Sequence, residues 1–526
     1  MIMEPLMRRY SDAKLSHASL CARLALPVLA ALLMASCTVG PRYHAPAPSA
    51  PPEFKEAKIA PTIPSPAAGK PDPTLQGLGQ WQVAAPSDAT LRGNWWELYN
   101  EPELNALEEQ LDINNQNIQQ AYENFMAARA QVRQARSAFF PTATVGAGAS
   151  RNRTSGTVAG STGSTYTALD LTSGISWEPD LWGKVRNAVR SAQYTAQLSA
   201  ADLESERLIE QSSLAEYFFE IRGQDAIEKI LDDAVAADKK SLDAEQARYD
   251  TGVDDRISLV EAQTTLASAQ SAAINNQVAR AQYEHAIATL IGKAASGFSV
   301  PVLAKTSAPP PIPIGLPSQL LQRRPDVAAA ERAMASANAQ IDVAFAAYFP
   351  TLTLSGSGGM ESSAIGKLLA ASSRFWSVGP SLSETVYDGG LRRATVNQYI
   401  ATYNADLAAY RQSVLTAFQQ VEDSLAAVRI LSDQLVRQQE AVDHAHTYLS
   451  LEQARYDTGI DPYIDLASAQ ITLYSNQQTL ASLQIQQMTA SVELIQALGG
   501  GWDKSQLPTP AQITQKPQPA DTVIQR

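Results

Sequence analysis

Cysteine, histidine and aromatic residues are scarce in this chain of 526 residues. It contains 2 cysteines and 5 histidines, and aromatic residues make up 7% of it. No nucleophile motif and no phosphate-cradling glycine loop accompanies the scattered histidines. His444 and His446 lie two residues apart, so on a helix they face different directions and do not suggest a metal site. The chain is therefore not expected to be an enzyme, and no metal is expected.

Positive charge is also in deficit. The chain has 41 Lys and Arg against 53 Asp and Glu, which gives a formal net charge of −12. This balance argues against a general nucleic-acid binder, which needs a basic surface. The length exceeds what one hydrophobic core usually holds, so two or more structural units are expected.

Long apolar runs are absent as well. The run from Leu24 to Ala35 has 12 residues, whereas a membrane helix needs about 20. Basic residues precede it and Met34-Ala35-Ser36-Cys37 ends it, which predicts a secretory signal over 1–36 with a lipobox. Cys37 is then the acylated first residue, and Thr38 after it favours the outer membrane over the inner one. An ordinary signal peptide with a chance cysteine is the alternative. No later segment is apolar enough for a membrane helix, so any crossing must use β-strands.

Two long stretches lack proline. None lies between Pro179 and Pro301, and Pro462 is the only one between residues 381 and 499. In the second stretch apolar residues recur at intervals of three and four, which predicts a sustained coiled-coil seam. A helix over 393–456 would be roughly 95 Å long at 1.5 Å per residue. The chain is therefore expected to contain helices far longer than those of a globular domain.

One octapeptide, EQARYDTG, occurs twice. It spans Glu245–Gly252 and Glu452–Gly459, an offset of 207 residues that holds without a gap as far as Gly292 and Gly499. Upstream, Phe-Pro-Thr at 140–142 is matched by Phe-Pro-Thr at 349–351, and a helical stretch is expected before each, over about 100–139 and about 325–347. These matches predict an internal repeat of one structural unit. The Thr-Gly at the end of each octapeptide is expected to end a long helix and to mark the tip of a helical hairpin.

Each unit also contains Gly/Ser/Thr-rich segments of alternating character, such as PTATVGAGAS and PTLTLSGSGG, which predict one β-hairpin per unit. One chain then offers four strands, too few to close a membrane barrel, whose smallest forms have about eight. Several copies are expected to share one barrel, and the residues alone do not choose between two copies and three. Trp177, Phe375 and Trp376 flank the predicted strands and are candidates for an interfacial aromatic belt, or for burial elsewhere.

Several motifs follow one another in order along the chain. They are Cys37-Thr-Val-Gly-Pro-Arg-Tyr43, Trp95-Trp96 with Leu98 and Tyr99, Leu321-Gln-Arg-Arg-Pro-Asp-Val327, both Arg-Tyr-Asp-Thr-Gly turns, and Leu498-Gly-Gly-Gly-Trp502. With them the chain resembles the TolC/OprM-type outer-membrane efflux factors, in the lipoprotein branch also called NodT-like. The resemblance implies a mostly helical fold with a β part. In it a homotrimer builds a shared 12-stranded transmembrane β-barrel, four strands per chain, continuous with an α-barrel tunnel of long helical hairpins and with an equatorial collar.

The resemblance also implies a function. The protein would be the exit duct of a tripartite efflux complex, lipid-anchored in the cell outer membrane and extending into the periplasm. It would passively conduct small toxic compounds or drugs from an inner-membrane pump, commonly proton-driven, by way of a periplasmic adaptor protein. No cofactor is implied apart from the covalent lipid on Cys37. A protein-secretion duct and a non-conducting periplasmic coiled-coil lipoprotein scaffold are the alternatives.

The expected domain organisation follows from the repeat and the resemblance. It comprises a signal peptide (1–36), a lipid-anchored Pro-rich tether with an N-terminal collar segment (37–92), repeat 1 (93–292), an equatorial linker (293–322), repeat 2 (323–502) and a flexible tail (503–526).

The resemblance assigns roles to residues at the helical tips. The adaptor-contacting tips are Arg248, Tyr249, Thr251 and Gly252 in the first unit, and Arg455, Tyr456, Thr458 and Gly459 in the second. Simple helix capping is the alternative role, since a helix end commonly needs a residue that tolerates positive φ.

The resemblance also implies a periplasmic gate just beyond the second tip. Ile464 would form a hydrophobic ring and Asp465 a carboxylate ring across the three-fold axis, while Ser468 stands where a second carboxylate is sometimes found. From the first unit, Ile257 and Glu261 are the corresponding gate candidates. The alternative for Asp465 is a solvated acid in the first turn of a helix, favoured by the helix dipole.

Overall fold

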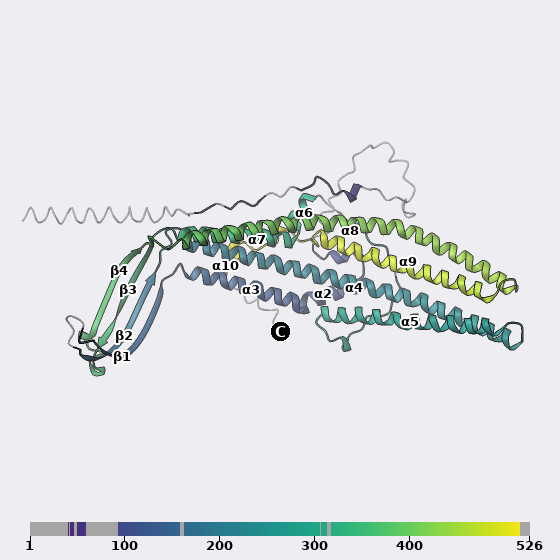
Figure 1. The fold of residues 1–526 in the computed structure, drawn as a ribbon, viewed down its shortest axis with the longest axis horizontal. Helices are drawn as coiled ribbons and strands as arrows, with labels where there is room; N and C mark the ends of the chain where they lie inside the picture. Colours follow the sequence, from purple (N-terminus) through teal and green to yellow (C-terminus); the bar gives the residue numbers. More distant parts are fainter. Residues whose placement is uncertain are drawn as a thin grey trace, which may run out of the picture.

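The computed structural model describes residues 40–41, 43–46, 50–58, 93–157, 163–305, 307–312 and 317–515. The predicted signal peptide, Cys37 and much of the predicted tether and tail lie outside these residues. The described chain is elongated, with a four-stranded sheet at one end and two helical hairpins reaching away from it (Figure 1). Among the described residues, no helix combines the length and the apolar character that a membrane crossing needs.

Four helices form the two long hairpins. α4 (Lys184–Asp250) and α8 (Leu391–Asp457) have 67 residues each, about 100 Å at 1.5 Å per residue. α5 (Arg256–Leu290) and α9 (Tyr463–Ala497) have 35 residues each and run back beside them (Figure 1). The predicted long helices are thus confirmed, and α8 begins two residues before the expected position.

The remaining helices of the described chain are shorter. They are α2 (Pro102–Asn114), α3 (Gln116–Ser137), α6 (Pro317–Arg323), α7 (Pro325–Ala346) and α10 (Pro510–Thr514), with 3₁₀ turns at Glu56–Lys58, Trp95–Tyr99, Ala295–Gly297, Ile365–Lys367, Ala371–Ser373 and Lys504–Gln506. The helical stretch expected over 100–139 is broken into α2 and α3. Asn115 causes the break, because its extended backbone ends α2 while its side chain accepts hydrogen bonds from the backbone N–H groups of Asn117 and Ile118.

The main hydrophobic core lies where α4 packs against its neighbours. α4 contacts α3, α5, α7 and α9, while α8 contacts α7 and α9. Phe218 and Leu214 of α4, Ile287 of α5 and Ile495 of α9 are fully buried there, together with Trp95. Much of the predicted seam of α8 is buried as well, at Val396, Tyr410, Val414, Ala417, Val421, Leu425 and Val442. This core joins the two units into one body.

The sheet contains β1 (Thr142–Arg153), β2 (Thr165–Trp177), β3 (Thr351–Ser362) and β4 (Arg374–Ser383), antiparallel and in that order. Both predicted β-hairpins are confirmed. β1 and β4 are the two edges, each paired on one side only among the described strands. Thr142 faces Ser176 in the first hairpin, and Thr351 faces Ser383 in the second. The two hairpins therefore share one register.

The two faces of the sheet differ in polarity. Because side chains alternate and registered partners share a face, one face collects the apolar residues. The apolar residues of this apolar face are Ala143, Val145, Ala147, Ala149, Leu169, Leu171, Ile175, Trp177, Leu352, Leu354, Met360, Trp376, Val378, Pro380 and Leu382. The other, polar face consists mainly of Gly, Ser and Thr, with Asp170, Glu361 and Phe375. Trp376, which is 80% exposed, thus fits the expected aromatic belt, whereas Phe375 points to the opposite side.

A short N-terminal segment lies along α7. Asn338 donates a hydrogen bond to the carbonyl of Pro41 at 3.2 Å, and the Tyr43 hydroxyl donates to the Glu331 carboxylate. Gly40 lies against Asp342, near the end of α7 that leads into β3. From Tyr43 back to Gly40, the segment therefore runs along α7 towards the sheet.

Candidate gate at the helical tips

Both tips of the hairpins end in the same type of helix cap. Gly252 and Gly459 each have φ of 74°, and a side chain there would meet no neighbouring atom. Val253 N–H donates to the carbonyl of Arg248 at 2.9 Å, and Ile460 N–H donates to that of Arg455 at 3.0 Å. This is the Schellman pattern, which needs a residue that tolerates positive φ. Glycine at each tip is thus accounted for by backbone geometry alone.

The threonines and acids of the tips complete the caps. Thr251 and Thr458 donate to the carbonyls of Ala247 and Ala454, at 2.8 and 3.0 Å. Asp255 caps α5 by accepting from the N–H groups of Ile257 and Ser258, at 2.8 and 3.1 Å. At the corresponding place α9 has Pro462, which provides no side-chain cap. The first residues of α9 are therefore held by other contacts.

The two tip arginines make different contacts. Arg455 forms an ion pair with Asp461 in its own turn, with 2.8 Å between Nη2 and Oδ1. Arg248 instead places its guanidinium carbon 4.1 Å from the centre of the Tyr456 ring, which belongs to the other hairpin. A cation over a ring is attracted by the negative face of the π system. Arg248 thus joins the two hairpins, whereas Arg455 stays within one.

Tyr456 is the centre of the contact between the tips. It is 5% exposed, and its hydroxyl donates a hydrogen bond to the carboxylate of Glu245, which is fully buried on α4. The ring of Tyr463 meets it edge-on at 6.3 Å. Burial raises the pKa of both groups; beyond this, the hydrogen bond raises the pKa of Tyr456 and opposes the shift of Glu245. The tyrosine is therefore neutral and donates to the acid.

The two tyrosines of the repeated octapeptide are not equivalent. Tyr249 is 40% exposed, as expected for a residue that meets a partner, but Tyr456 is enclosed by Glu245, Arg248 and Tyr463. The predicted adaptor contact of Tyr456 stays a prediction, while the structure makes the two turns differ in exposure. The reason is that within one chain only the second tip has another hairpin on the side where its tyrosine points.

The expected gate residues lie in the first two turns of α5 and α9. Ile257 and Ile464 occupy corresponding positions and are 67% and 54% exposed. Asp465 and Ser468 are also exposed, and Glu261 is half-buried. Among the described residues none of the five side chains has a hydrogen bond or an ion pair. One chain does not bring them into a constriction, so their role stays a prediction.

Glu245 is the tip residue that sequence reasoning missed. It is the first residue of the repeated octapeptide, so the repeat itself points to it, whereas the family resemblance gives roles only from Arg248 onward. Its counterpart Glu452 lies beside Asp461, and the pKa of Glu452 is raised, by burial first and then by that neighbouring carboxyl. The acid at the start of the octapeptide thus contacts a tyrosine in the first occurrence and a carboxyl group in the second.

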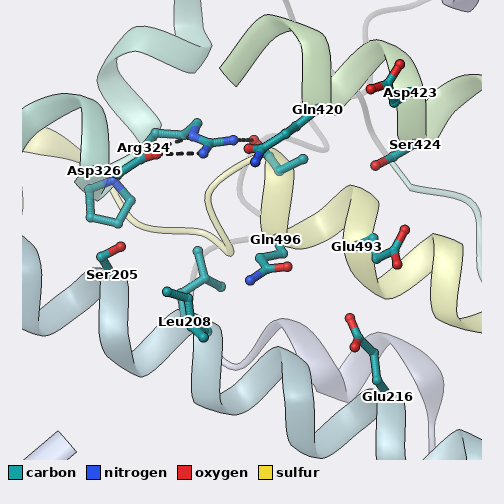
Figure 2. A pocket seen from close by; sticks show the side chains of 13 residues that line it. Ser205, Leu208, Glu216, Arg324, Asp326, Gln420, Asp423, Ser424, Glu493 and Gln496 are labelled. Atoms are coloured by element: carbon teal, nitrogen blue, oxygen red, sulfur yellow. Dashed lines mark hydrogen bonds and ion pairs between the residues drawn. The ribbon is translucent and has the colours of Figure 1, made fainter. Parts of the chain in front are cut away.

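A cavity of about 690 Å³ lies between α4, α7, α8 and α9 in the middle of the molecule. In Figure 2 the side chains of Glu216 and Glu493 point toward one another across it. Burial, followed by the charges of Glu493 and Glu220, raises the pKa of Glu216 to about 7. Arg324 at the cavity wall pairs with Asp326 at 2.6 Å and donates to the carbonyl of Ala497 at 3.1 Å. Where the chain is described, no cluster of three metal-binding side chains occurs.

Comparisons with known proteins agree on one group of proteins. The family model described as outer membrane efflux protein matches residues 107–293 and 316–500. The solvent efflux pump outer membrane protein SrpC of Pseudomonas putida is 31% identical over 488 residues, covering 91% of this chain and 99% of that protein. The pyoverdine export outer membrane protein OpmQ of Pseudomonas aeruginosa is 31% identical over 446 residues, covering 82% and 92%. Among solved structures, the outer-membrane channel OprN matches with a TM-score of 0.76 and 27% identity, over 89% of this chain and all of that one.

Proposed function

We propose that this chain, which belongs to the outer membrane efflux protein family, forms the exit duct of a tripartite efflux complex as a homotrimer. Its sheet would contribute four strands to a 12-stranded barrel in the outer membrane, and its helical hairpins would form a tunnel through the periplasm. Small toxic compounds or drugs would pass from an inner-membrane pump, commonly proton-driven, through a periplasmic adaptor into this duct. Transport then requires a passage and no bond chemistry.

One observation carries the proposal: the sheet has an apolar face, a Gly/Ser/Thr face and two unpaired edges. In a membrane barrel, the lipid-facing side is apolar and the side lining a water-filled lumen is polar. Open edges in lipid leave backbone groups without partners, so β4 of one copy is expected to pair with β1 of the next.

The pairing of β4 of one copy with β1 of the next is called the seam here, and the internal repeat predicts its register. Ser176 of β2 faces Ser355 of β3 within one chain. The repeat relates Ser176 to Ser383 of β4, 207 residues later, and Ser355 to Gly146 of β1, 209 residues earlier. Ser383 of one copy should therefore face Gly146 of the next copy. Continuing antiparallel from this pair, Leu382 faces Ala147 of the next copy and Trp376 faces Arg153. All these residues keep their faces, so the apolar and polar sides continue unbroken across the seam.

The long helices support the same arrangement. On α9, Ala467, Ala481 and Ile485 are buried, and Ile485 packs against Gly223 of α4. The corresponding residues of α5 are Val260, Ile274 and Val278, which are 46%, 67% and 55% exposed. The counterpart of Gly223 is Ile430 of α8, itself 52% exposed.

An apolar stripe on α5 is therefore left without a partner in one chain, at the place where α9 has one. α8 of a neighbouring copy, with Ile430 opposite Val278, would cover it as α4 covers α9.

The position of the N-terminal segment supports a lipid anchor on Cys37. Cys37 lies three residues before Gly40, so the chain can carry it at most about 11 Å from that residue. Gly40 lies against Asp342, close to the start of the sheet. An acyl chain on Cys37 would therefore reach the same membrane that the sheet crosses.

The tips would contain the gate and the adaptor contact. Ile464 and Asp465, with Ile257 and Glu261 from the first hairpin, would gather around the three-fold axis when three copies assemble. Like charges gathered at a narrow neck repel unless they are paired or hydrated, so Asp465 would favour opening and attract cations. Arg248, Tyr249, Arg455 and the tip glycines would meet the adaptor.

A cross-link across the seam tests the proposal. The double variant L382C with A147C should give covalently linked trimers on oxidation, visible in a non-reducing gel. The matched control L382C with G146C moves one cysteine by one residue to the opposite face and should give no cross-link. A wild-type sample controls for Cys21 and Cys37. Chains that remain monomeric by mass, or that cross-link only in the control, would refute the shared barrel, and planar-bilayer conductance separates a duct from a scaffold.

A further inference from the structure

Three arginines lie at the end of the sheet farthest from the helices. Arg151 and Arg153 are on β1 and Arg374 is on β4, and all three side chains are exposed on the apolar face. None has an ion pair with another described residue. The carboxylates of this end, Asp170 and Glu361, face each other in the register of β2 and β3 on the polar face. Charge is thus separated by face, with the cations on the outward side.

The height of the arginines fits the far membrane surface. Arg151 lies ten residues beyond Pro141, which begins the apolar face beside the helices, and ten residues span about 34 Å along a strand. At a strand tilt of about 40° this corresponds to roughly 25 Å of height, the usual apolar band of such barrels. Trp376, two residues from Arg374 on the same face, fits the aromatic girdle at that level. The guanidinium groups then lie among the lipid headgroups.

Assembly places Arg374 beside Arg153 of the next copy. Within one chain β1 and β4 are opposite edges of the sheet, about 14 Å apart at three strand spacings. Across the seam, Trp376 faces Arg153 of the next copy, which places Arg374 diagonal to Arg153 on the same face. Diagonal neighbours lie about 7–8 Å apart, within reach of long side chains. Arg151 of the next copy follows two residues along the same strand.

We propose that each seam forms a binding site for a phosphate-bearing lipid headgroup, held by Arg374 of one copy and by Arg151 and Arg153 of the next. Three cations that follow one another along the seam, without an ion pair among the described residues, repel each other unless an anion lies between them. Guanidinium groups bind phosphate oxygens through paired N–H donors, so a phosphate group matches them in charge and geometry. The arginines lie at the level of the lipid headgroups, so the anion assigned to the site is a lipid phosphate. This inference rests on the proposed trimeric barrel.

Lipid retention tests the inference on the full-length, acylated trimer. Native mass spectrometry from phosphatidylcholine nanodiscs that contain phosphatidic acid should show about three retained phosphatidic acid molecules per trimer, one per seam. The triple variant R151Q/R153Q/R374Q should lose at least about tenfold in this retention. The control R133Q/K240Q/R411Q removes the same charge from exposed positions on α3, α4 and α8 and should retain lipid like the wild type.

Two results would overturn the inference: equal retention by the triple variant and the wild type, or equal loss in the control. The same spectra report the trimer mass, so a variant that fails to assemble is recognised at once. The variant R151K/R153K/R374K, which keeps the charge, should recover part of the retention. If the seam cross-link forms but the triple variant retains as much lipid as the wild type, the proposed headgroup site is wrong and the proposed duct is unaffected. If the cross-link fails, the duct itself is wrong.

Discussion

Replacing Tyr456 by Phe is the sharpest test of the contact between the tips. The change removes one hydroxyl group and leaves the ring under Arg248 and beside Tyr463 in place. The buried carboxylate of Glu245 then loses the hydrogen bond that Tyr456 donates. A hydrogen bond to a charged group contributes about 1.5–3 kcal/mol, so a loss of about 2 kcal/mol per chain is expected.

The loss of free energy would add up over the three chains of the proposed trimer. If the three contacts break together when the gate opens, the loss sums to about 6 kcal/mol, which shifts the equilibrium between closed and open forms by roughly 10⁴-fold. Losing the hydrogen bond also raises the pKa of Glu245 further, because the bond opposes the effect of burial. The carboxyl takes up a proton more readily as pH falls, so the effect of Y456F should be larger at pH 8 than at pH 5.

Single-channel conductance in planar bilayers measures this effect directly. Y456F trimers should show larger conductance and longer open times than the wild type. Y448F is the matched control, since Tyr448 lies on the same helix, is 40% exposed and has no side-chain hydrogen bond among the described residues. Equal conductance of Y456F, Y448F and the wild type, in trimers of correct mass, would show that the Glu245–Tyr456 contact does not hold the gate.

Four further changes have defined outcomes. D465A should change conductance or cation preference, and a correctly assembled trimer without either change would remove Asp465 from the gate. E216Q should raise the melting temperature at pH 8 and leave it unchanged near pH 4. The pKa of Glu216 is about 7 in the folded chain, above its ordinary value in the unfolded chain, so the folded state loses stability as the pH rises from that ordinary value through 7. The gain at pH 8 should be at most about 2 kcal/mol, given partial exposure, and the opposite pH dependence would contradict it. E108M should stabilise by about 1–3 kcal/mol in denaturant unfolding, because Glu108 is fully buried and neither carboxylate oxygen has a hydrogen-bond partner among the described residues; a loss of stability would contradict this reasoning. C37S should abolish the lipid mass on the mature protein and keep the trimer, and a retained lipid would place the anchor elsewhere.

Much of the fold was predictable because it depends on local sequence. Absence of proline and a regular apolar pattern located α8 to within two residues at its start, and the Gly/Ser/Thr segments located both hairpins. The family resemblance, drawn from short motifs in order, is confirmed. The break at Asn115 was missed because one capping side chain interrupts an otherwise helical pattern.

The sites were less predictable because they depend on packing between distant segments. The two octapeptides are identical in sequence, yet Tyr249 is exposed and Tyr456 is buried, so only their neighbours distinguish them. Glu216 and Glu493 line the same cavity although they are 277 residues apart in sequence, and no local sequence pattern predicts that they lie close together. The predicted gate residues are a stronger case, since in the proposed trimer their surroundings would include other copies of the chain, which a single sequence does not describe.

The open edges of the sheet also constrain the order of biogenesis. β1 and β4 each present a row of unpaired N–H and C=O groups, and each such group costs several kcal/mol in hydrocarbon. In the proposed membrane barrel, a solitary subunit would therefore not be a stable insertion intermediate. Oligomerisation would have to precede or accompany entry into the bilayer, and until then the nascent subunit would need water, or a chaperone, along both edges.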